Sequence, residues 1–146
     1  MPAPPRWSPP REREFSRMPN ARIETRRGWI SGRNHEIIEA VHAAMVEALK
    51  IPAHDRTLRL VEHEPANIST PPDKGERYTL VEITLFSGRS MNAKRALYQA
   101  IVRNLGAFDV PATDVKVVLI EVPTENWGVA GGKPASEIDL GFKVDV

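Results

Sequence analysis

The most informative segment of this sequence reads Ile51-Pro52-Ala53-His54-Asp55, and a near copy of it returns later as Val110-Pro111-Ala112-Thr113-Asp114. Residues 51–62 and 110–121, aligned on these two segments, are identical at five of twelve positions. Two unrelated segments of average composition would share about one position. We therefore interpret the chain as two copies of one structural unit.

The first copy has the pattern of a strand, a helix and a second strand. Apolar and polar residues alternate over 21–25, which predicts a short strand, and Ser31-Gly32 predicts a turn at which a helix starts. Apolar residues then recur at three- and four-residue spacing up to about Lys50, and Pro52 ends this pattern. Residues 57–63 predict the second strand.

The second copy follows a predicted loop over 64–77, which is rich in proline. Residues 78–86 are the most strand-like run in the chain. Ser90 is expected to cap the next helix and Gly106 to end it. Residues 115–122 predict a strand that is so apolar that we expect it to be buried on both faces.

The two halves, about 19–63 and 78–122, predict an α+β domain over residues 18–146. In it a duplicated β-α-β unit forms one four-stranded sheet with two helices on one face. A C-terminal tail follows, in which weak alternation after Glu137 predicts a terminal strand. Apolar residues are expected on both sides of the sheet, so a symmetric oligomer is the simplest cover for the face away from the helices. The apolar residues expected to supply the two sides of the sheet are Leu80, Ile83, Leu85, Val117 and Leu119.

The N-terminal segment differs from the rest in composition. Residues 1–17 hold five of the 13 prolines and four arginines, with no periodic apolar face, so they predict a disordered extension. The alternative is that Met18 is the true initiator and the extension is not translated. Removal of Met18 would leave Pro19 as the N-terminal residue, with a free secondary amine that no internal proline has.

Composition excludes several classes of protein. The chain has 146 residues, a formal net charge of +1 and no cysteine, which rules out disulfides, thiolate chemistry and cysteine-bound zinc. We therefore expect a reducing, cytoplasmic location. No run approaches the roughly 18 apolar residues of a membrane span. The near-zero charge gives no general attraction to nucleic acid or to membranes.

The second predicted helix begins in an unusually basic segment. Between Glu82 and Asp109 the chain has no carboxylate, and Arg89 stands beside the helix cap. Because a helix N-terminus already carries partial positive charge, the two together predict an anion site suited to a carboxylate or phosphate. The alternative is that Arg89 points to water or pairs with a distant acid. On the anion-site interpretation, Arg89→Ala should abolish turnover and leave the fold unchanged.

Metal and nucleotide chemistry find no support in the sequence. His35 and His42 lie seven residues apart, without the four-residue spacing of a zinc-binding helix, and no carboxylate cluster completes a ligand set. There is no phosphate-binding loop, dinucleotide fingerprint or nucleophile elbow. The predicted strand over 57–63 also lacks the aromatic residues with which ferredoxin-like domains stack RNA bases. We expect no metal and no cofactor.

Four segments together resemble the tautomerase superfamily and, within it, the malonate semialdehyde decarboxylase branch most: Met18-Pro19, residues 51–56, Ser87-Gly88-Arg89-Ser90, and Glu125-Asn126-Trp127-Gly128. The resemblance covers about residues 18–130. It implies a homotrimer of paired β-α-β units whose N-terminal proline lies in a pocket near the subunit boundaries. It also implies a cofactor-free enzyme that acts on a small carboxylate.

The resemblance assigns roles to four residues. Pro19 would be the catalytic amine, which moves a proton between carbon and oxygen of a 2-oxo acid or its enol. Arg89 would bind the substrate carboxylate, Asp55 would hold the reacting groups, and Trp127 would form an apolar wall. Structural alternatives stay open for two of them, because Asp55 has a twin in Asp114 and Trp127 could belong to the core.

Three functions therefore compete. The first is a tautomerase that interconverts keto and enol forms of a small 2-oxo carboxylic acid. The second is a lyase or hydratase on a 3-oxo acid, like malonate semialdehyde decarboxylase, although that branch carries two arginines where this chain has only Arg89. The third is a non-catalytic oligomeric protein that binds an anion, because a retained extension would turn the Pro19 amine into an amide.

Overall fold

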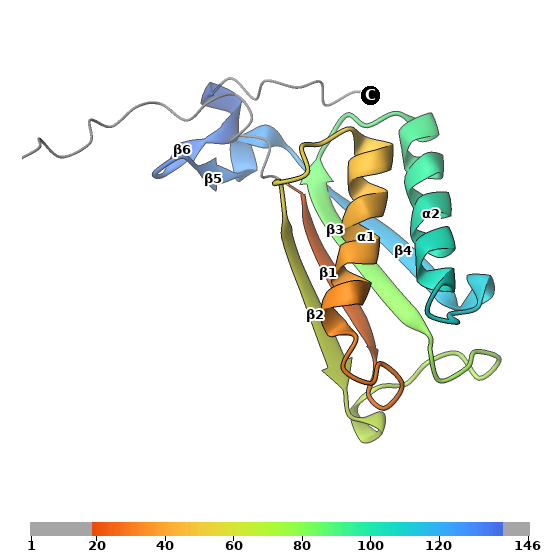
Figure 1. Cartoon of the computed structure of the whole chain (residues 1–146). Coiled ribbons are helices and arrows are strands. Elements are labelled where there is room, and N and C mark those ends of the chain that lie inside the picture. Colours follow the sequence, from red (N-terminus) through yellow and green to blue (C-terminus); the bar gives the residue numbers. More distant parts are fainter. Residues whose placement is uncertain (1–18, 139–146) are drawn as a thin grey trace, which may run out of the picture.

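The computed structural model describes residues 19–138, which fold into a four-stranded sheet, two long helices and a small hairpin (Figure 1). The interpretations of residues 1–17 and of Met18, and the terminal strand expected after Glu137, fall outside these residues. The elements are β1 (Asn20–Arg26), α1 (Asn34–Leu49), β2 (Thr57–His63), β3 (Thr79–Phe86), α2 (Met91–Gly106), β4 (Val115–Val122), β5 (Gly128–Val129) and β6 (Lys133–Pro134).

The sheet has the strand order β2-β1-β3-β4. β1 is parallel to β2 and β3 is parallel to β4, whereas β1 and β3 at the centre are antiparallel. Each half of the chain is thus one β-α-β unit, and the two units join through their first strands. Both helices lie on the same face of the sheet (Figure 1), which confirms the predicted duplicated α+β fold.

The sequence repeat corresponds to a repeated turn before the last strand of each unit. The Asp55 amide donates to the Pro52 carbonyl at 3.0 Å, and the Asp114 amide donates to the Pro111 carbonyl at 2.8 Å. In each case proline fixes the backbone at the start of the turn, and the aspartate ends it just before the strand. Because the same turn occurs in both halves, their sequences match at this point.

The core lies between the sheet and the helices. Alternate residues of the two central strands point to the helices, as the period of a strand requires, and residues at helical spacing on α1 and α2 meet them. Each of these side chains is at most 1% exposed, so each contributes roughly 1.5–3 kcal/mol by burial. They include Ile23, Val81, Ile83, Leu85, Ile37, Val41, Met45, Leu97, Ile101 and Leu105. No helix within residues 19–138 is long and apolar enough to cross a membrane.

Both ends of α2 lie where the sequence predicts them. The Ser90 hydroxyl accepts a hydrogen bond from the Ala93 amide at 3.1 Å, so Ser90 caps α2 as expected. Helix α2 ends at Gly106, as predicted, and the left-handed residue that follows is Asp109 (φ 59°). Helix α1 begins at Asn34, after a turn in which Ser31 has φ 56°.

The expectation that residues 115–122 are buried on both faces is wrong. β4 is an edge strand, and its side chains alternate between half-buried and exposed as far as Ile120. Val118 is 37% exposed and Ile120 is 41% exposed. Edge position limits burial because only one neighbouring strand and one helix can cover the chain there.

The side of the sheet away from the helices is called the open face here. Leu80 lies on it, whereas Ile83, Leu85, Val117 and Leu119 pack into the core below the helices, so the five residues supply both sides of the sheet unequally. Strand alternation and register place a mixed set of residues on the open face: Val61, Leu80, Val118 and Ile120 among charged Arg22, Glu24, Arg59, Glu82 and Lys116.

Candidate functional site

The topology brings three of the four predicted site residues to one end of the sheet. Asn20, the first residue of β1, pairs with Thr57 at the start of β2 and with Thr84 near the end of β3. Pro19 directly precedes β1, Asp55 lies two residues before β2, and Arg89 lies three residues after β3. All three therefore lie at the end of the sheet where α1 finishes and α2 starts (Figure 1).

Pro19 is buried at this end. Alternation along β1 puts Pro19 on the same side as Ala21, which is the side that the helices cover. If the register of β1 is continued by one residue, Pro19 lies across from Arg56 on one side and Leu85 on the other. Pro19 thus lies beside the end of the turn that contains Asp55.

Arg89 is buried, with 6% of its surface exposed. Its Nη1 donates a hydrogen bond of 2.7 Å to the carbonyl oxygen of Leu49, the last residue of α1. The last carbonyls of a helix have no partner within the helix and carry partial negative charge, which suits a guanidinium. Lys50 adopts the left-handed conformation (φ 57°) that ends α1 at this carbonyl.

Asp55 is fully buried close to Arg89. Burial lowers the pKa of the Arg89 guanidinium, and the nearby Asp55 carboxylate opposes this by favouring the charged form. Arg89 is thus buried near Asp55, so the alternative that it points to water is wrong. The other alternative, an acid distant in sequence, describes Asp55.

Two residues of α1 hold the turn that carries Asp55. His42, 5% exposed, places its Nε2 2.7 Å from the carbonyl oxygen of Ala53. Arg56 donates a short hydrogen bond to the Glu39 carboxylate. Neither contact was predicted, because each joins a helix residue to the turn across the fold. A histidine on the apolar face of the helix was the only signal in the sequence.

Trp127 lies at the same end, after β4. Its ring meets the Phe86 ring edge-on, with centroids 5.2 Å apart and an interplanar angle of 74°. Its Nε1 donates to the Val122 carbonyl at 3.1 Å. With Ala135 and Val129 these rings form a small apolar cluster apart from the main core. Trp127 is half-buried, so it anchors the β5–β6 hairpin and leaves part of its ring exposed.

The counterparts of Asp55 and Arg89 in the repeat have structural roles; they are Asp114 and, from the match of Ser31-Gly32-Arg33 with Ser87-Gly88-Arg89, Arg33. Asp114 is 5% exposed and accepts a hydrogen bond of 3.0 Å from the Gly75 amide. Arg33, the repeat partner of Arg89, donates to the Ile30 carbonyl and lies 5.3 Å from the Phe108 ring centroid. Asp114 thus holds the loop before β3, which shows that an aspartate at this position of the repeat serves the fold.

The structure offers no metal centre within residues 19–138, because no three His, Asp or Glu side chains there converge as ligands. His35 is largely exposed and lies 3.5 Å from Glu39 on the same helix. His63 ends β2 and lies 3.2 Å from Glu24. Asp55, Arg56 and Arg89 are charged residues that lie at the same end of the sheet as Pro19.

Known proteins resemble this chain in sequence. The family described as Tautomerase enzyme matches residues 55–130, which include Asp55, Arg89 and Trp127. A protein of Ralstonia nicotianae named "Probable tautomerase" is 48% identical over 56 residues, which are 36% of this chain and 76% of that protein. The 2-hydroxymuconate tautomerase of Comamonas testosteroni is 39% identical over 51 residues, which are 34% of this chain and 81% of that enzyme.

Solved structures share the fold. A malonate semialdehyde decarboxylase inhibited by 3-bromopropiolate is 26% identical, with a TM-score of 0.71 over 78% of this chain and 91% of that chain. A symmetric trimer described as fused 4-OT is also 26% identical, with a TM-score of 0.69 over 80% of this chain and 96% of that chain. Together with the match over residues 55–130, these relationships show that the chain belongs to the tautomerase family.

Proposed function

We propose that this protein is a cofactor-free tautomerase that interconverts the keto and enol forms of a small 2-oxo carboxylic acid. The observation that carries the proposal is the meeting of Pro19, Asp55 and Arg89 at one end of the sheet. The catalytic form is the chain that begins at Pro19, because only an N-terminal proline has a basic secondary amine.

The Pro19 amine is the general base and acid in this mechanism. It takes a proton from a carbon next to the substrate carbonyl, which leaves an enolate, and then returns a proton to oxygen or carbon. For the first step the amine has to be neutral, and burial near a guanidinium favours the neutral form. The buried Arg89 charge also attracts the substrate carboxylate and stabilises negative charge on the enolate.

Asp55 and Trp127 complete the site. Asp55 balances the charge of Arg89, and the turn that carries it is fixed by His42 and Glu39 from α1. Trp127 offers an apolar wall for the body of the substrate. The similarity to a 2-hydroxymuconate tautomerase supports proton transfer as the reaction class. The fused 4-OT trimer supports a homotrimeric assembly.

The second candidate is a lyase or hydratase reaction on a 3-oxo acid. It is favoured by the complete burial of Asp55 near Arg89, together with the structural similarity to malonate semialdehyde decarboxylase. In such a reaction a protonated Pro19 would polarise the carbonyl. The segment Ser87-Gly88-Arg89 supplies one arginine at the start of α2, which favours the tautomerase.

A comparison of two N-termini tests the proposal. One protein begins at Pro19 and the other comprises residues 1–146, and both are assayed by ultraviolet absorbance with 2-hydroxymuconate and with a 3-oxo acid. We expect enol turnover only when the Pro19 amine is free. Release of carbon dioxide from the 3-oxo acid, without turnover of 2-hydroxymuconate, would support the second candidate. Equal turnover by both proteins would refute the proline mechanism, and binding without turnover would identify an anion-binding protein.

A further inference from the structure

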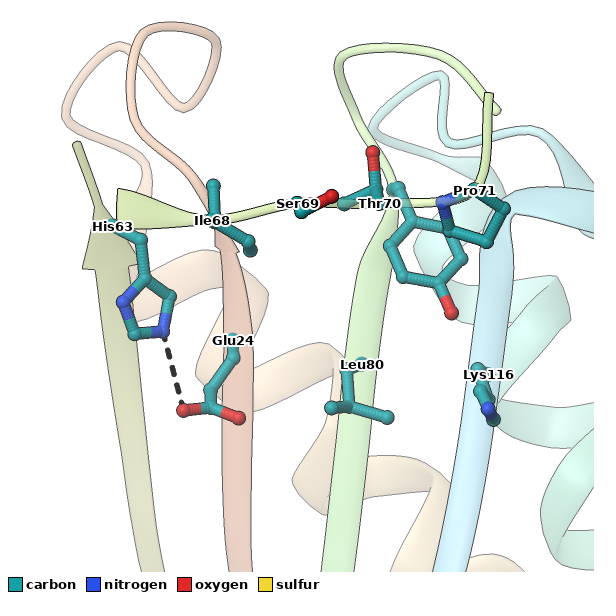
Figure 2. A pocket seen from close by; sticks show the side chains of 9 residues that line it. Glu24, His63, Ile68, Ser69, Thr70, Pro71, Leu80 and Lys116 are labelled. Atoms are coloured by element: carbon teal, nitrogen blue, oxygen red, sulfur yellow. Dashed lines mark hydrogen bonds and ion pairs between the residues drawn. The ribbon is translucent and has the colours of Figure 1, made fainter. Parts of the chain in front are cut away.

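A pocket lies on the open face, at the end of the sheet opposite Pro19 (Figure 2). It has a volume of about 360 Å³. The segment of residues 68–71 crosses above the strands and forms its upper rim, and Leu80 forms part of its floor. Glu24 and His63 line one side, and Lys116 lines the other. The size falls in the usual range for small-molecule sites.

The acidic side of this pocket is already neutralised. Glu24 Oε1 lies 3.2 Å from His63 Nε2 and 3.0 Å from Arg22 Nη2, and the Glu24 side chain is 14% exposed. Glu24 therefore has a full positive partner in Arg22 and a hydrogen-bond partner in His63. Its carboxylate adds little net negative charge to the pocket.

The opposite side keeps a positive charge. Lys116 stands across Leu80 from Glu24 in the strand register and forms no salt bridge with any residue of 19–138. Lys116 lies on the edge strand β4 and is exposed in the single chain. Among residues 19–138, the pocket thus has one cation without an acidic partner.

The remaining lining is mainly apolar, with a few hydroxyl groups. Ile68, Pro71 and Leu80 supply aliphatic surface, and Tyr78 adds an aromatic ring. Hydroxyl groups of the lining residues, such as that of Thr70, can donate to an oxygen of a ligand. An apolar lining with one cation matches a ligand that has an apolar body and one negative charge.

We propose that this pocket binds a small organic monocarboxylate, with its carboxylate on Lys116 and its apolar body over Leu80. The site is separate from the one around Pro19, because it lies at the other end of the sheet and on the other face. It needs no free proline amine, so it does not depend on the proposed function. A small acid bound there would lie on the face that we expect an oligomer to cover, and not beside the reacting groups.

Nuclear magnetic resonance of the ¹⁵N-labelled full chain tests this site, with benzoate as the probe and neutral benzamide as its control. We expect benzoate to shift the amide signals of Ser69, Thr70, Leu80 and Lys116, and benzamide to shift them far less. Lys116→Gln should weaken benzoate binding by about tenfold, since it removes a charge-assisted hydrogen bond. Arg59→Gln removes a charge from the same face outside the pocket and should leave the affinity unchanged.

Three results would overturn the proposal. Benzoate shifts confined to residues around Arg89 would place the only carboxylate site at the Pro19 end. Equal affinity of the Lys116→Gln and wild-type proteins would remove the role of the lysine. The absence of shifts at the pocket amides at saturating benzoate would show that the open face is closed to ligands in the assembled protein.

Discussion

The guanidinium of Arg89 donates a 2.7 Å hydrogen bond to the carbonyl oxygen of Leu49, which ties the start of α2 to the end of α1. The two residues are 40 positions apart in sequence, and each lies at a helix terminus. The contact fixes the end of the molecule at which Pro19 and Asp55 also lie. Arg89 therefore has a structural role in addition to its proposed role with the substrate.

Arg89→Ala should lower both stability and turnover. The substitution leaves the Leu49 carbonyl and the buried Asp55 without the cation, so we expect a loss of about 1–3 kcal/mol in the free energy of unfolding. Urea unfolding followed by circular dichroism measures this loss. Arg89→Lys keeps the charge and serves as the control. An Arg89→Ala protein as stable as the wild type would contradict the buried geometry.

His42→Ala should loosen the turn that carries Asp55. It removes the contact with the Ala53 carbonyl and leaves a cavity under α1, so we expect about 2 kcal/mol of destabilisation and reduced turnover. His35→Ala is the matched control on the same helix, because its side chain is 82% exposed. If both variants unfolded at the same urea concentration, the His42 contact would contribute nothing.

The Glu39–Arg56 pair should make stability depend on pH in acid. The hydrogen bond from Arg56 lowers the pKa of Glu39 in the folded protein. A depressed acid pKa stabilises the fold above the ordinary glutamate pKa, and this contribution is lost as pH falls through the lowered value. Both side chains are more than a third exposed, so the effect should stay below about 1 kcal/mol.

Glu39→Gln tests that pair. The variant should lose the contribution at neutral pH and match the wild type at pH values below the folded-state pKa of Glu39. Free energies of unfolding measured across the acid range for both proteins give the difference directly. If the two proteins differed in free energy of unfolding by the same amount at every pH, the ionisation of Glu39 would not contribute to that difference.

Trp127→Ala should weaken substrate binding more than it weakens the fold. The ring packs on Phe86 in a small cluster that is separate from the main core, so its loss affects the β5–β6 hairpin first. We expect a higher KM, with the main unfolding transition little changed. Trp127→Phe keeps an aromatic ring and loses the hydrogen bond to the Val122 carbonyl. Its KM should therefore lie between the KM values of the wild type and of Trp127→Ala. If Trp127→Ala lowered kcat and left KM unchanged, Trp127 would not be an apolar wall that binds the substrate.

The repeat made the fold predictable from the sequence. Matching residues around Pro52 and Pro111 encode the same turn twice, and apolar periodicity between them identifies the helices. The order of the strands in the sheet was harder to predict from the sequence. An apolar run such as 115–122 has the same composition at the centre of a sheet and at its edge, so hydrophobicity did not reveal that β4 has only one neighbour.

The sequence predicts which residues form the candidate site, but it does not predict what surrounds them. Pro19, Asp55 and Arg89 were identified through the motifs, and the topology brings them to one end of the sheet. The burial of Arg89 could not be foreseen, because its acceptor is a backbone carbonyl that carries no sequence signature. The contact of His42 with Ala53 was missed for the same reason.

Mass spectrometry after treatment with 2-oxo-3-pentynoate tests the role of Pro19 most directly. This electrophilic 2-oxo acid forms a carbon–nitrogen bond when a neutral amine adds to its alkyne. With the protein that begins at Pro19, we predict loss of activity and a single adduct on the Pro19 nitrogen, and no adduct at that position in the 1–146 chain. Full labelling at another residue, or sustained turnover after Pro19 is modified, would contradict the proline mechanism.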